Sequence, residues 1–409
     1  MKVLALGGPG AMGTVAVQTA VNLPGVEEIV IADRDLAAAE RLAHRLASAS
    51  MPVRARKVDV TDDTELREAL SSSDLVLNTV GPYYRFGLTV LRAAIETQTH
   101  YLDICDDWEP TLQMLDLDTA ARDAGVCAVI GMGASPGISN LLAATAAAEL
   151  DSVLDVYTAW PVDVPGAGDS DKNDAQLLDP DNRPSAAAVH WMQQISGTIS
   201  AVQAGQLTQQ RPLRPVTLAL PGGRHGTAYT VGHPEPVTLQ RTLEPAGEAV
   251  NLMVINPWTV AYLDTLRRDI DRGRLTNEAA AGQFAKPNAL RIIRAVPTAL
   301  RSKAPGTLPP FFAAVSGTRQ GSEHMVLAHL SQSVPNDDPV RGLLGDMARV
   351  TGIPLAMGMS QVVDGTARLP GVHPPEAVID PKRFFDDLDR QLGRITTTPI
   401  FLVERESIR

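Results

Sequence analysis

Short apolar runs alternate with longer stretches of helical periodicity along the first 135 residues of the chain. The apolar runs predict strands, and the stretches between them, rich in alanine and leucine, predict helices. Strands that are separated by helices form parallel sheets covered on both faces. We therefore expect a doubly wound parallel α/β fold, with strands at residues 2–8, 27–34, 53–60, 74–82, 100–105 and 126–133 and helices at residues 11–23, 36–49, 62–73, 88–98 and 117–125.

The pattern changes after about residue 150. Several strand-like segments follow one another without long crossovers, which is typical of an α+β domain with a mixed or antiparallel sheet. A segment rich in Pro, Gly, Asp and Asn predicts a long loop at residues 165–185. We expect strands at residues 154–164, 215–220, 227–232 and 236–243, helices at 186–207 and 258–300, and a hairpin at 311–331 that turns at 318–323.

The last part of the chain is mainly helical. Residues 340–365 predict a helix that breaks near Gly352 and Pro354, a proline-rich segment follows at 369–381, and residues 382–393 predict a final helix. We expect this tail to pack back against the first domain. The predicted boundaries are therefore residues 1–135, 136–335 and 336–409.

Three glycines in the sequence GGPGAMG directly follow the first predicted strand. Gly8, Gly10 and Gly13 fit the pattern G-x-G-x-x-G, and the next predicted helix begins within it. In a Rossmann fold the first glycine permits a tight turn, the second lets the backbone approach a pyrophosphate, and the third permits close packing of helix and strand. The helix N-terminus then presents N–H groups to the phosphates. The alternative is a glycine-rich turn without a ligand.

Asp33 ends the second predicted strand, twenty residues after Gly13. An acidic residue there accepts hydrogen bonds from the adenosine ribose and repels a 2′-phosphate, which favours NAD. Arg34 follows at once, and an arginine can bind that 2′-phosphate. We therefore expect NAD or NADP, with NAD slightly favoured. The other residues that we assign to the cofactor are Pro9, Ala11, Met12, Asp59, Val80, Gly81 and Pro82.

Candidate catalytic and substrate-binding residues follow later strands of the first domain, because ligands of this fold bind at the carboxyl ends of the strands. Tyr83, His100 and Asp107 are the candidates for proton transfer, and Tyr84 is a candidate for binding the substrate. The alternatives are surface tyrosines, a histidine bonded to backbone, and aspartates that cap a helix. Ser135 and Asn140 are further candidates for binding the substrate, because the helix N-terminus predicted there, at the domain junction, has free N–H groups that suit a carboxylate. The alternative is a hinge with a capped helix.

The second domain contributes Arg224 and His225 as candidate substrate-binding residues, and His233 is a further candidate for proton transfer. These three residues lie on a predicted hairpin, so the alternative is that they are turn residues. Residues 163–185 are a candidate lid over the site. The pattern Tyr-x-x-x-Lys of short-chain reductases is absent from the sequence, and so are paired zinc motifs, so we predict no metal.

Composition and charge narrow the class of protein. Apolar residues make up 44% of the chain and charged residues 20%, which is typical of a soluble globular protein. The net charge of −11 argues against partners such as nucleic acid or an anionic membrane surface. Two cysteines do not indicate a disulfide framework, and neither a signal peptide nor an apolar run of membrane-spanning length is evident. We expect a cytoplasmic protein with a small-molecule substrate.

Five segments in this order resemble the saccharopine dehydrogenase-like oxidoreductases, a group that includes carboxynorspermidine and lysine dehydrogenase-type enzymes. They are GGPGAMG, NTVGPYYRFG, HYLDI, GASPGISN and LPGVHPPEAVIDP. The resemblance is good over residues 1–150 and thin over 151–330. It implies a Rossmann domain, a second α+β domain that carries the substrate pocket and the contacts of a homodimer, and a nicotinamide cofactor.

The resemblance also implies a function, since family members make or break C–N bonds of amino acids by imine reduction or amine oxidation. We therefore predict an NAD(P)-dependent oxidoreductase that transfers hydride to or from the imine or amine of an amino-acid-like substrate. The alternatives are a ketone or enoyl reductase of specialised metabolism and a non-catalytic dinucleotide-binding regulator. The middle domain offers no arginine or lysine cluster that matches a known substrate pocket, so the identity of the substrate does not carry over.

Overall fold

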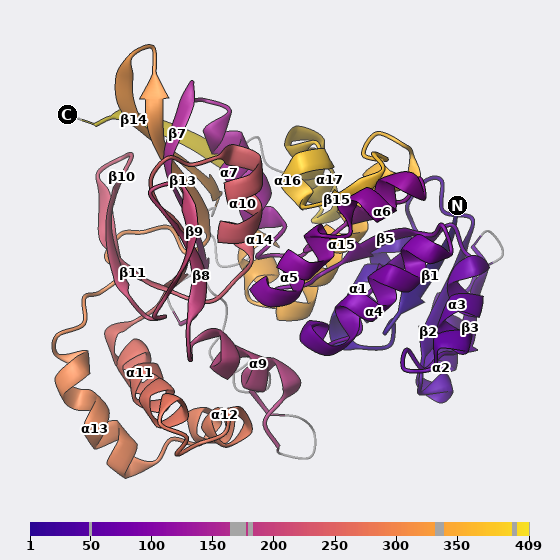
Figure 1. Ribbon diagram of the computed structural model, residues 1–409, viewed down its shortest axis with the longest axis horizontal. Coiled ribbons are helices and arrows are strands. Elements are labelled where there is room, and N and C mark those ends of the chain that lie inside the picture. Colours follow the sequence, from indigo (N-terminus) through magenta and orange to yellow (C-terminus); the bar gives the residue numbers. More distant parts are fainter. Residues whose placement is uncertain (49–50, 164–176, 179–182, 332–338, 395–398, 409) are drawn as a thin grey trace. The chain divides into compact units, whose positions relative to one another are not determined.

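The computed structural model describes residues 1–48, 51–163, 177–178, 183–331, 339–394 and 399–408. The chain divides into two compact units (Figure 1). The first unit comprises Met1–Leu141 and Met347–Ile395, and the second comprises Leu142–Asp346 and Thr396–Arg409. Most of the candidate lid at residues 163–185 lies outside the described residues.

The first unit contains a sheet of seven parallel strands in the order β15-β6-β5-β4-β1-β2-β3 (Figure 1). Its central strands are nearly continuous apolar runs and are buried, as strands covered on both faces must be. The strands are β1 (Lys2–Leu6), β2 (Glu28–Asp33), β3 (Val53–Lys57), β4 (Leu75–Asn78), β5 (His100–Asp103), β6 (Cys127–Val129) and β15 (Gly371–His373).

Helices connect these strands and cover the sheet. Acidic side chains begin two of the helices, since Asp35 accepts a hydrogen bond from the Ala38 N–H and Asp62 accepts bonds from the N–H groups of Thr64 and Glu65. The helices of this part of the chain are α1 (Ala11–Ala20), α2 (Leu36–Leu46), α3 (Asp63–Ser71), α4 (Tyr83–Glu96), α5 (Trp108–Leu115), α6 (Asp118–Asp123) and α7 (Ile138–Ala147).

After residue 346 the chain leaves the second unit and returns to the first unit. Helix α15 (Met347–Val363) packs against α1 and strand β15 pairs with β6, so a segment more than 200 residues away completes the parallel sheet. The short helix α16 (Pro375–Val378) and the longer helix α17 (Pro381–Gln391) end this segment. Residues 396–409 belong instead to the second unit, where β16 (Phe401–Ser407) pairs with β14.

The second unit contains a mixed sheet in the order β10-β11-β12-β7-β13-β14-β16, and β8 pairs with both β12 and β9. The pairing of β12 with β7 is parallel and the other pairings are antiparallel. The predicted fold class, a doubly wound parallel sheet followed by an α+β domain, is confirmed. The strands are β7 (Ser152–Pro161), β8 (Ile199–Gln203), β9 (Gln206–Gln210), β10 (Pro215–Leu220), β11 (Arg224–Thr230), β12 (Ala249–Val254), β13 (Phe312–Arg319) and β14 (Ser322–Leu330).

Aromatic side chains of helices α9 and α12 and of strand β7 pack together in the second unit. Trp191 and Phe284 pack edge to face with ring centroids 4.9 Å apart, and Trp160 lies beside Trp191. The helices are α9 (Ala186–Gln194), α10 (Glu235–Leu243), α11 (Pro257–Asp271), α12 (Asn277–Ala285), α13 (Ala289–Ala299) and α14 (Pro339–Leu344). Among the described residues, no helix combines the length and apolar character that crossing a membrane requires.

Two segments of the second unit differ from their predicted secondary structure: part of a predicted helix forms strands, and a predicted strand forms a helix. The helix predicted at residues 186–207 ends at Gln194, and a β8–β9 hairpin follows because Ala204 and Gly205 both take positive φ angles, of 48° and 75°. The strand predicted at residues 236–243 is helix α10, which has Pro236 in its first turn. The β-branched residues of that segment favoured a strand locally, but tertiary packing overrides this preference.

The predicted break in the helix at residues 340–365 is wrong near Gly352 and Pro354, since α15 runs through both. The reason is close packing, because a β-carbon at Gly352 would lie 2.5 Å from the Met12 carbonyl oxygen and 2.9 Å from the Val15 β-carbon. A glycine is therefore required where α15 crosses α1.

We expect Gly352→Ala to lower the free energy of unfolding by about 1–3 kcal/mol, because the added methyl group must displace α1. Gly342→Ala is the matched control: it also lies in a helix, and a β-carbon there would meet no atom within 4 Å. This control is expected to raise stability by roughly 0.5–1 kcal/mol. Urea unfolding, with hydrogen exchange of the α1 amides, measures both effects. Equal stability of the two variants would contradict this account of the α1–α15 contact.

Candidate functional site

The turn between β1 and α1 carries the predicted glycine pattern. Gly7 adopts a φ of +71°, and the Gly10 N–H donates a hydrogen bond to the Gly7 carbonyl (3.0 Å). Gly10 then precedes α1, and no side chain caps that helix. Because the first N–H groups of a helix have no partners within it, the start of α1 presents N–H donors and a partial positive charge. This arrangement suits a pyrophosphate.

The glycines of this turn differ in what they permit. A β-carbon at Gly13 would lie 2.6 Å from the Gly7 oxygen, and one at Gly8 would lie 2.9 Å from the Ile31 side chain. At Gly10 the only contact would be the Gly7 oxygen, at 3.1 Å. We assigned the tight turn to Gly8, but the positive φ angle of this turn is at Gly7, one residue earlier. Gly8 and Gly13 thus permit packing, and the backbone at Gly10 is left open for a close ligand. Pro9, Ala11 and Met12 complete this turn.

Asp33 and Asp59 lie at the carboxyl ends of neighbouring strands. Asp33 is the last residue of β2, pairs with Lys57 of β3, and accepts a hydrogen bond from the Asp35 N–H (2.9 Å). Hydrogen bonds from Thr61, together with the charges of Arg34 and Lys57, lower the pKa of Asp59. Both acids and the cation Arg34 therefore lie at the sheet edge where a Rossmann fold binds the adenosine ribose.

A buried polar network joins the carboxyl ends of β4 and β5. The Tyr101 hydroxyl donates to Asp103 Oδ2 (2.7 Å), and the Asn78 amide donates to the Tyr101 oxygen (3.0 Å). Asp103 Oδ1 accepts bonds from the N–H groups of Gly131 (2.6 Å) and Cys105 (3.0 Å). Burial raises the pKa of Asp103 to about 6, although these hydrogen bonds oppose the shift. The network ties β4 and β5 to the loop after β6.

Tyr83 belongs to this network. Its hydroxyl donates to the Asn78 carbonyl (2.7 Å), and burial raises its pKa well above the usual value of 10. The structure therefore supports a positioning role for Tyr83 rather than proton transfer. Tyr84 is the next residue, and 58% of it is exposed. Val80, Gly81 and Pro82 form the turn that leads from β4 into α4.

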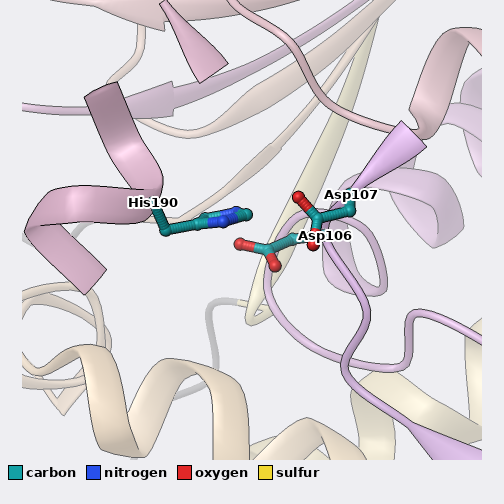
Figure 2. Close-up of side chains that lie close together, drawn as sticks. All are labelled: Asp106, Asp107 and His190. Carbon is teal, nitrogen blue, oxygen red and sulfur yellow. The ribbon is translucent and has the colours of Figure 1, made fainter. Parts of the chain in front are cut away.

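The loop from β5 to α5 carries Asp106 and Asp107 (Figure 2). Asp107 is buried at the start of α5, and its carbonyl accepts a bond from the Thr111 hydroxyl (2.7 Å). This loop follows the carboxyl end of β5, as the glycine turn follows the carboxyl end of β1. Proton transfer by Asp107 stays a prediction.

His100 lies at the amino end of its strand, whereas the candidate cofactor residues lie at the carboxyl ends of theirs. It is the first residue of β5, and its ring nitrogen Nδ1 accepts a bond from the Cys127 N–H (3.1 Å). Burial lowers the pKa of His100, which keeps the ring neutral at pH 7. The structure does not place His100 near the carboxyl ends of the strands. Its contacts fit the alternative stated above, a histidine bonded to the backbone.

Ser135 and Asn140 follow β6. Asn140 is buried, its amide donates to Glu376 Oε2 (2.8 Å), and its oxygen accepts a bond from the Ser139 hydroxyl (3.2 Å). Ser135 lies in the loop before α7. Asn140 thus connects α7 to the returning segment of the first unit, a contact that places it in the interior.

In the second unit, Arg224 begins β11 and forms an ion pair with Glu404 at 2.8 Å. His225 is exposed, and its N–H donates to the Thr307 hydroxyl (2.9 Å). Both residues lie on β11, at its start, and contacts within this unit account for both of them.

His233 and Glu235 are buried in the second unit. His233 Nδ1 lies 3.5 Å from Glu235 Oε2, and the Asn251 amide donates to Glu235 Oε1 (2.8 Å). The Trp160 indole donates to the Asn251 oxygen (2.9 Å) and its ring lies 5.5 Å from the His233 ring. A fully buried carboxylate requires such partners. Helix α9 of the same unit carries His190, which Figure 2 labels.

Sequence analysis did not name several residues of these networks as candidates, among them Asn78, Tyr101, Glu235 and Asn251. Asn78 has a signal that could have identified it, since it is the polar residue that ends an otherwise apolar strand. Glu235 had none, because it lies between two predicted strands, at residues 227–232 and 236–243.

The family model for the saccharopine dehydrogenase NADP-binding domain matches residues 3–129. Carboxynorspermidine synthase of Vibrio cholerae is 25% identical over 414 residues, which cover 95% of this chain and 94% of that protein. This chain is an NAD(P)-dependent oxidoreductase that is similar to the saccharopine dehydrogenases.

Two other proteins are similar to this saccharopine dehydrogenase-like chain. The NADP-dependent, L-glutamate-forming saccharopine dehydrogenase of Pyricularia oryzae is 31% identical over 116 residues, or 28% of this chain and 24% of that protein. The apo L-Glu-forming saccharopine dehydrogenase of Saccharomyces cerevisiae has the same fold, with a TM-score of 0.62, 17% identity and full coverage of both chains. The predicted family, enzyme class and nicotinamide cofactor are confirmed.

The Asp103 carboxyl makes a specific pH dependence testable in this saccharopine dehydrogenase-like oxidoreductase. The native protein keeps a proton on Asp103 up to about pH 6, whereas the unfolded chain releases it near pH 4. The native state thus binds more protons in this window. We expect the free energy of unfolding to fall by about 3 kcal/mol as the pH rises from about 4 to about 6, relative to Asp103→Asn.

Urea unfolding at a series of pH values measures this difference. The exposed Asp116→Asn controls for the loss of one carboxyl group in the same unit. If the wild type and Asp103→Asn had parallel profiles between pH 4 and 6, Asp103 would not titrate as its burial requires.

Proposed function

We propose that this oxidoreductase transfers hydride between NAD(P) and the C–N bond of an amino-acid-like amine. An amine and a carbonyl compound condense with loss of water to an imine, and NAD(P)H with a proton reduces the imine to a secondary amine. The reverse reaction oxidises the secondary amine. The observation that carries the proposal is the alignment with carboxynorspermidine synthase, because it spans 95% of the chain and therefore both units.

The cofactor supplies the hydride, and the protein supplies its position. We propose that the start of α1 binds the pyrophosphate and that Asp33 binds the adenosine ribose, with Arg34 and Asp59 beside it. The glycine turn supports this proposal, because Gly10 leaves backbone accessible at the helix N-terminus. Gly81 also leaves open space at the turn after β4, where a β-carbon would meet no atom within 4 Å.

Asp107 is our proposed proton-handling residue of the first unit, and Tyr84 is our proposed substrate contact there. Both lie at the carboxyl edge of the parallel sheet. A feature of the second unit also supports the proposal of an amine substrate. The carboxylate of Glu235 and the ring of Trp160 belong to one hydrogen-bonded network there. Carboxylates and tryptophan rings both attract organic ammonium groups.

We also propose a homodimer in the cytoplasm, with residues 1–135 as the dinucleotide-binding domain and 136–335 as the substrate and dimerisation domain. The resemblance to the family supports the dimer. Cys105 and Cys127 are both free and buried, which suits a reducing compartment.

The function is tested by following NADH and NADPH oxidation with a panel of amines and carbonyl compounds. We expect turnover only when an amine and a carbonyl are present together, and mass spectrometry should identify a secondary amine. Glu235→Gln is expected to raise the KM for the amine roughly tenfold, since a charge-assisted contact contributes about 1.5–3 kcal/mol. The exposed Glu244→Gln, also on the α10 segment, is its control.

Other outcomes of this experiment would overturn the proposal. Turnover of a ketone or an enoyl compound without an amine would assign the protein to the corresponding reductases. Tight binding of the cofactor with no turnover on any of these substrates would favour a regulator.

Cofactor preference tests the assignment of Asp33. We expect Asp33→Ser to raise the ratio of kcat/KM with NADPH to kcat/KM with NADH at least tenfold, because the repulsion of a 2′-phosphate is removed while an acceptor for the Asp35 N–H remains. Arg34→Ala should change this ratio in the opposite direction. An unchanged ratio in both variants would place the ribose away from the end of β2.

A further inference from the structure

A cavity of about 600 Å³ lies within the second unit, between the β10–β11 hairpin and helices α11 and α13. Its size is that of a typical small-molecule pocket. None of its lining residues belongs to the candidate site described above, and all of them lie in the second unit. The cavity is therefore a separate feature of the molecule.

The charge of this cavity is opposite to that of the whole chain. Five cations line it, namely Arg211, Arg268, Arg294, Arg301 and Lys303, and Asp264 is the one acid among the lining residues. The chain as a whole has a net charge of −11. Cations of this density in an acidic protein repel one another, and an anion between them relieves that repulsion.

Buried acids fix three of these arginines in place. Arg294 makes two bonds to Asp269, at 2.9 and 3.1 Å, and Asp269 is almost fully buried. Arg268 forms an ion pair with Asp264, and Arg211 approaches the same carboxylate at 3.5 Å. An arginine fixed in this way still presents its remaining N–H donors.

The other two cations make no ion pair within the part of the chain that the structure describes. Arg301 donates Nε–H to the Pro297 carbonyl (2.9 Å), which orients its guanidinium group. The backbone of Lys303 is fixed on both sides by Tyr229, whose hydroxyl donates to the Lys303 carbonyl (3.0 Å) and accepts from its N–H (2.9 Å). Two exposed cations are thus positioned at the cavity without acidic partners.

The floor of the cavity is apolar, since Leu213, Tyr229 and Val260 line it and are buried. An inorganic anion alone would leave this surface in contact with water. A ligand that matches both features has several negative charges and a compact apolar part.

We propose that this cavity binds a small polyanion of the nucleoside polyphosphate class. Its phosphates contact Arg301, Lys303 and Arg268, and its apolar part lies on the floor. Because the proposed cofactor-binding residues are in the first unit, this ligand binds in addition to NAD(P).

Isothermal titration calorimetry of the full chain, saturated with NADH, tests the proposal with ATP as the probe. We expect one ATP per chain, weaker binding of tripolyphosphate because it lacks the apolar part, and weaker binding still of inorganic phosphate. Affinity should fall as the salt concentration rises. Saturation with NADH separates this site from the cofactor site.

Two variants locate the site. Arg301→Glu and Lys303→Glu are each expected to weaken ATP binding roughly tenfold or more. The control is Arg241→Glu, which makes the same change of charge at an exposed position of the same unit outside the cavity. All three positions are exposed, and circular dichroism checks the fold.

Three results would overturn the proposal. The first is no binding of ATP or tripolyphosphate at low salt. The second is an equal loss of affinity in Arg241→Glu, which would indicate a general effect of charge. The third is binding of polyglutamate but not of ATP, which would identify the face as a docking site for an acidic protein segment.

Discussion

The start of helix α1 depends on contacts that only glycine permits. On one side Gly13 packs against the Gly7 carbonyl, and on the other side Gly352 of α15 packs against the Met12 carbonyl. A side chain at either position would displace the helix whose N-terminus faces the proposed pyrophosphate. The segment that returns from the end of the chain therefore supports the proposed cofactor site, although it contributes no residue of the glycine pattern.

A second constraint lies at the carboxyl ends of β4 and β5. Asp103 accepts three hydrogen bonds that connect β5 to Gly131 and, through Tyr101, to Asn78. Burial of this carboxyl group opposes its ionisation, so the network is retained against a cost in stability. Tyr83 bonds to the same strand end, which explains why this tyrosine is buried while Tyr84 is exposed.

Much of the fold was predictable from the sequence because its strands carry strong local signals. The apolar runs of β1, β2 and β4 predicted a parallel sheet, and the glycine pattern with Asp33 predicted a dinucleotide at its edge. Local signals failed where tertiary packing decides the outcome. Val237 and Thr238 favour a strand but lie in α10, and Pro354 favours a break but lies within α15.

The sequence by itself determined where we propose the cofactor site, since the spacing of glycines after a strand is a local property of the chain. Only the tertiary structure decided which polar residues share a network. Asn78 and Asp103 lie at the carboxyl ends of neighbouring strands and share a network. His100 is only 3 positions before Asp103, but it lies at the amino end of the same strand and takes no part in that network. Strand pairing and packing over long sequence distances place Gly352 beside α1 and Asn251 beside Glu235, and no local pattern encodes those contacts.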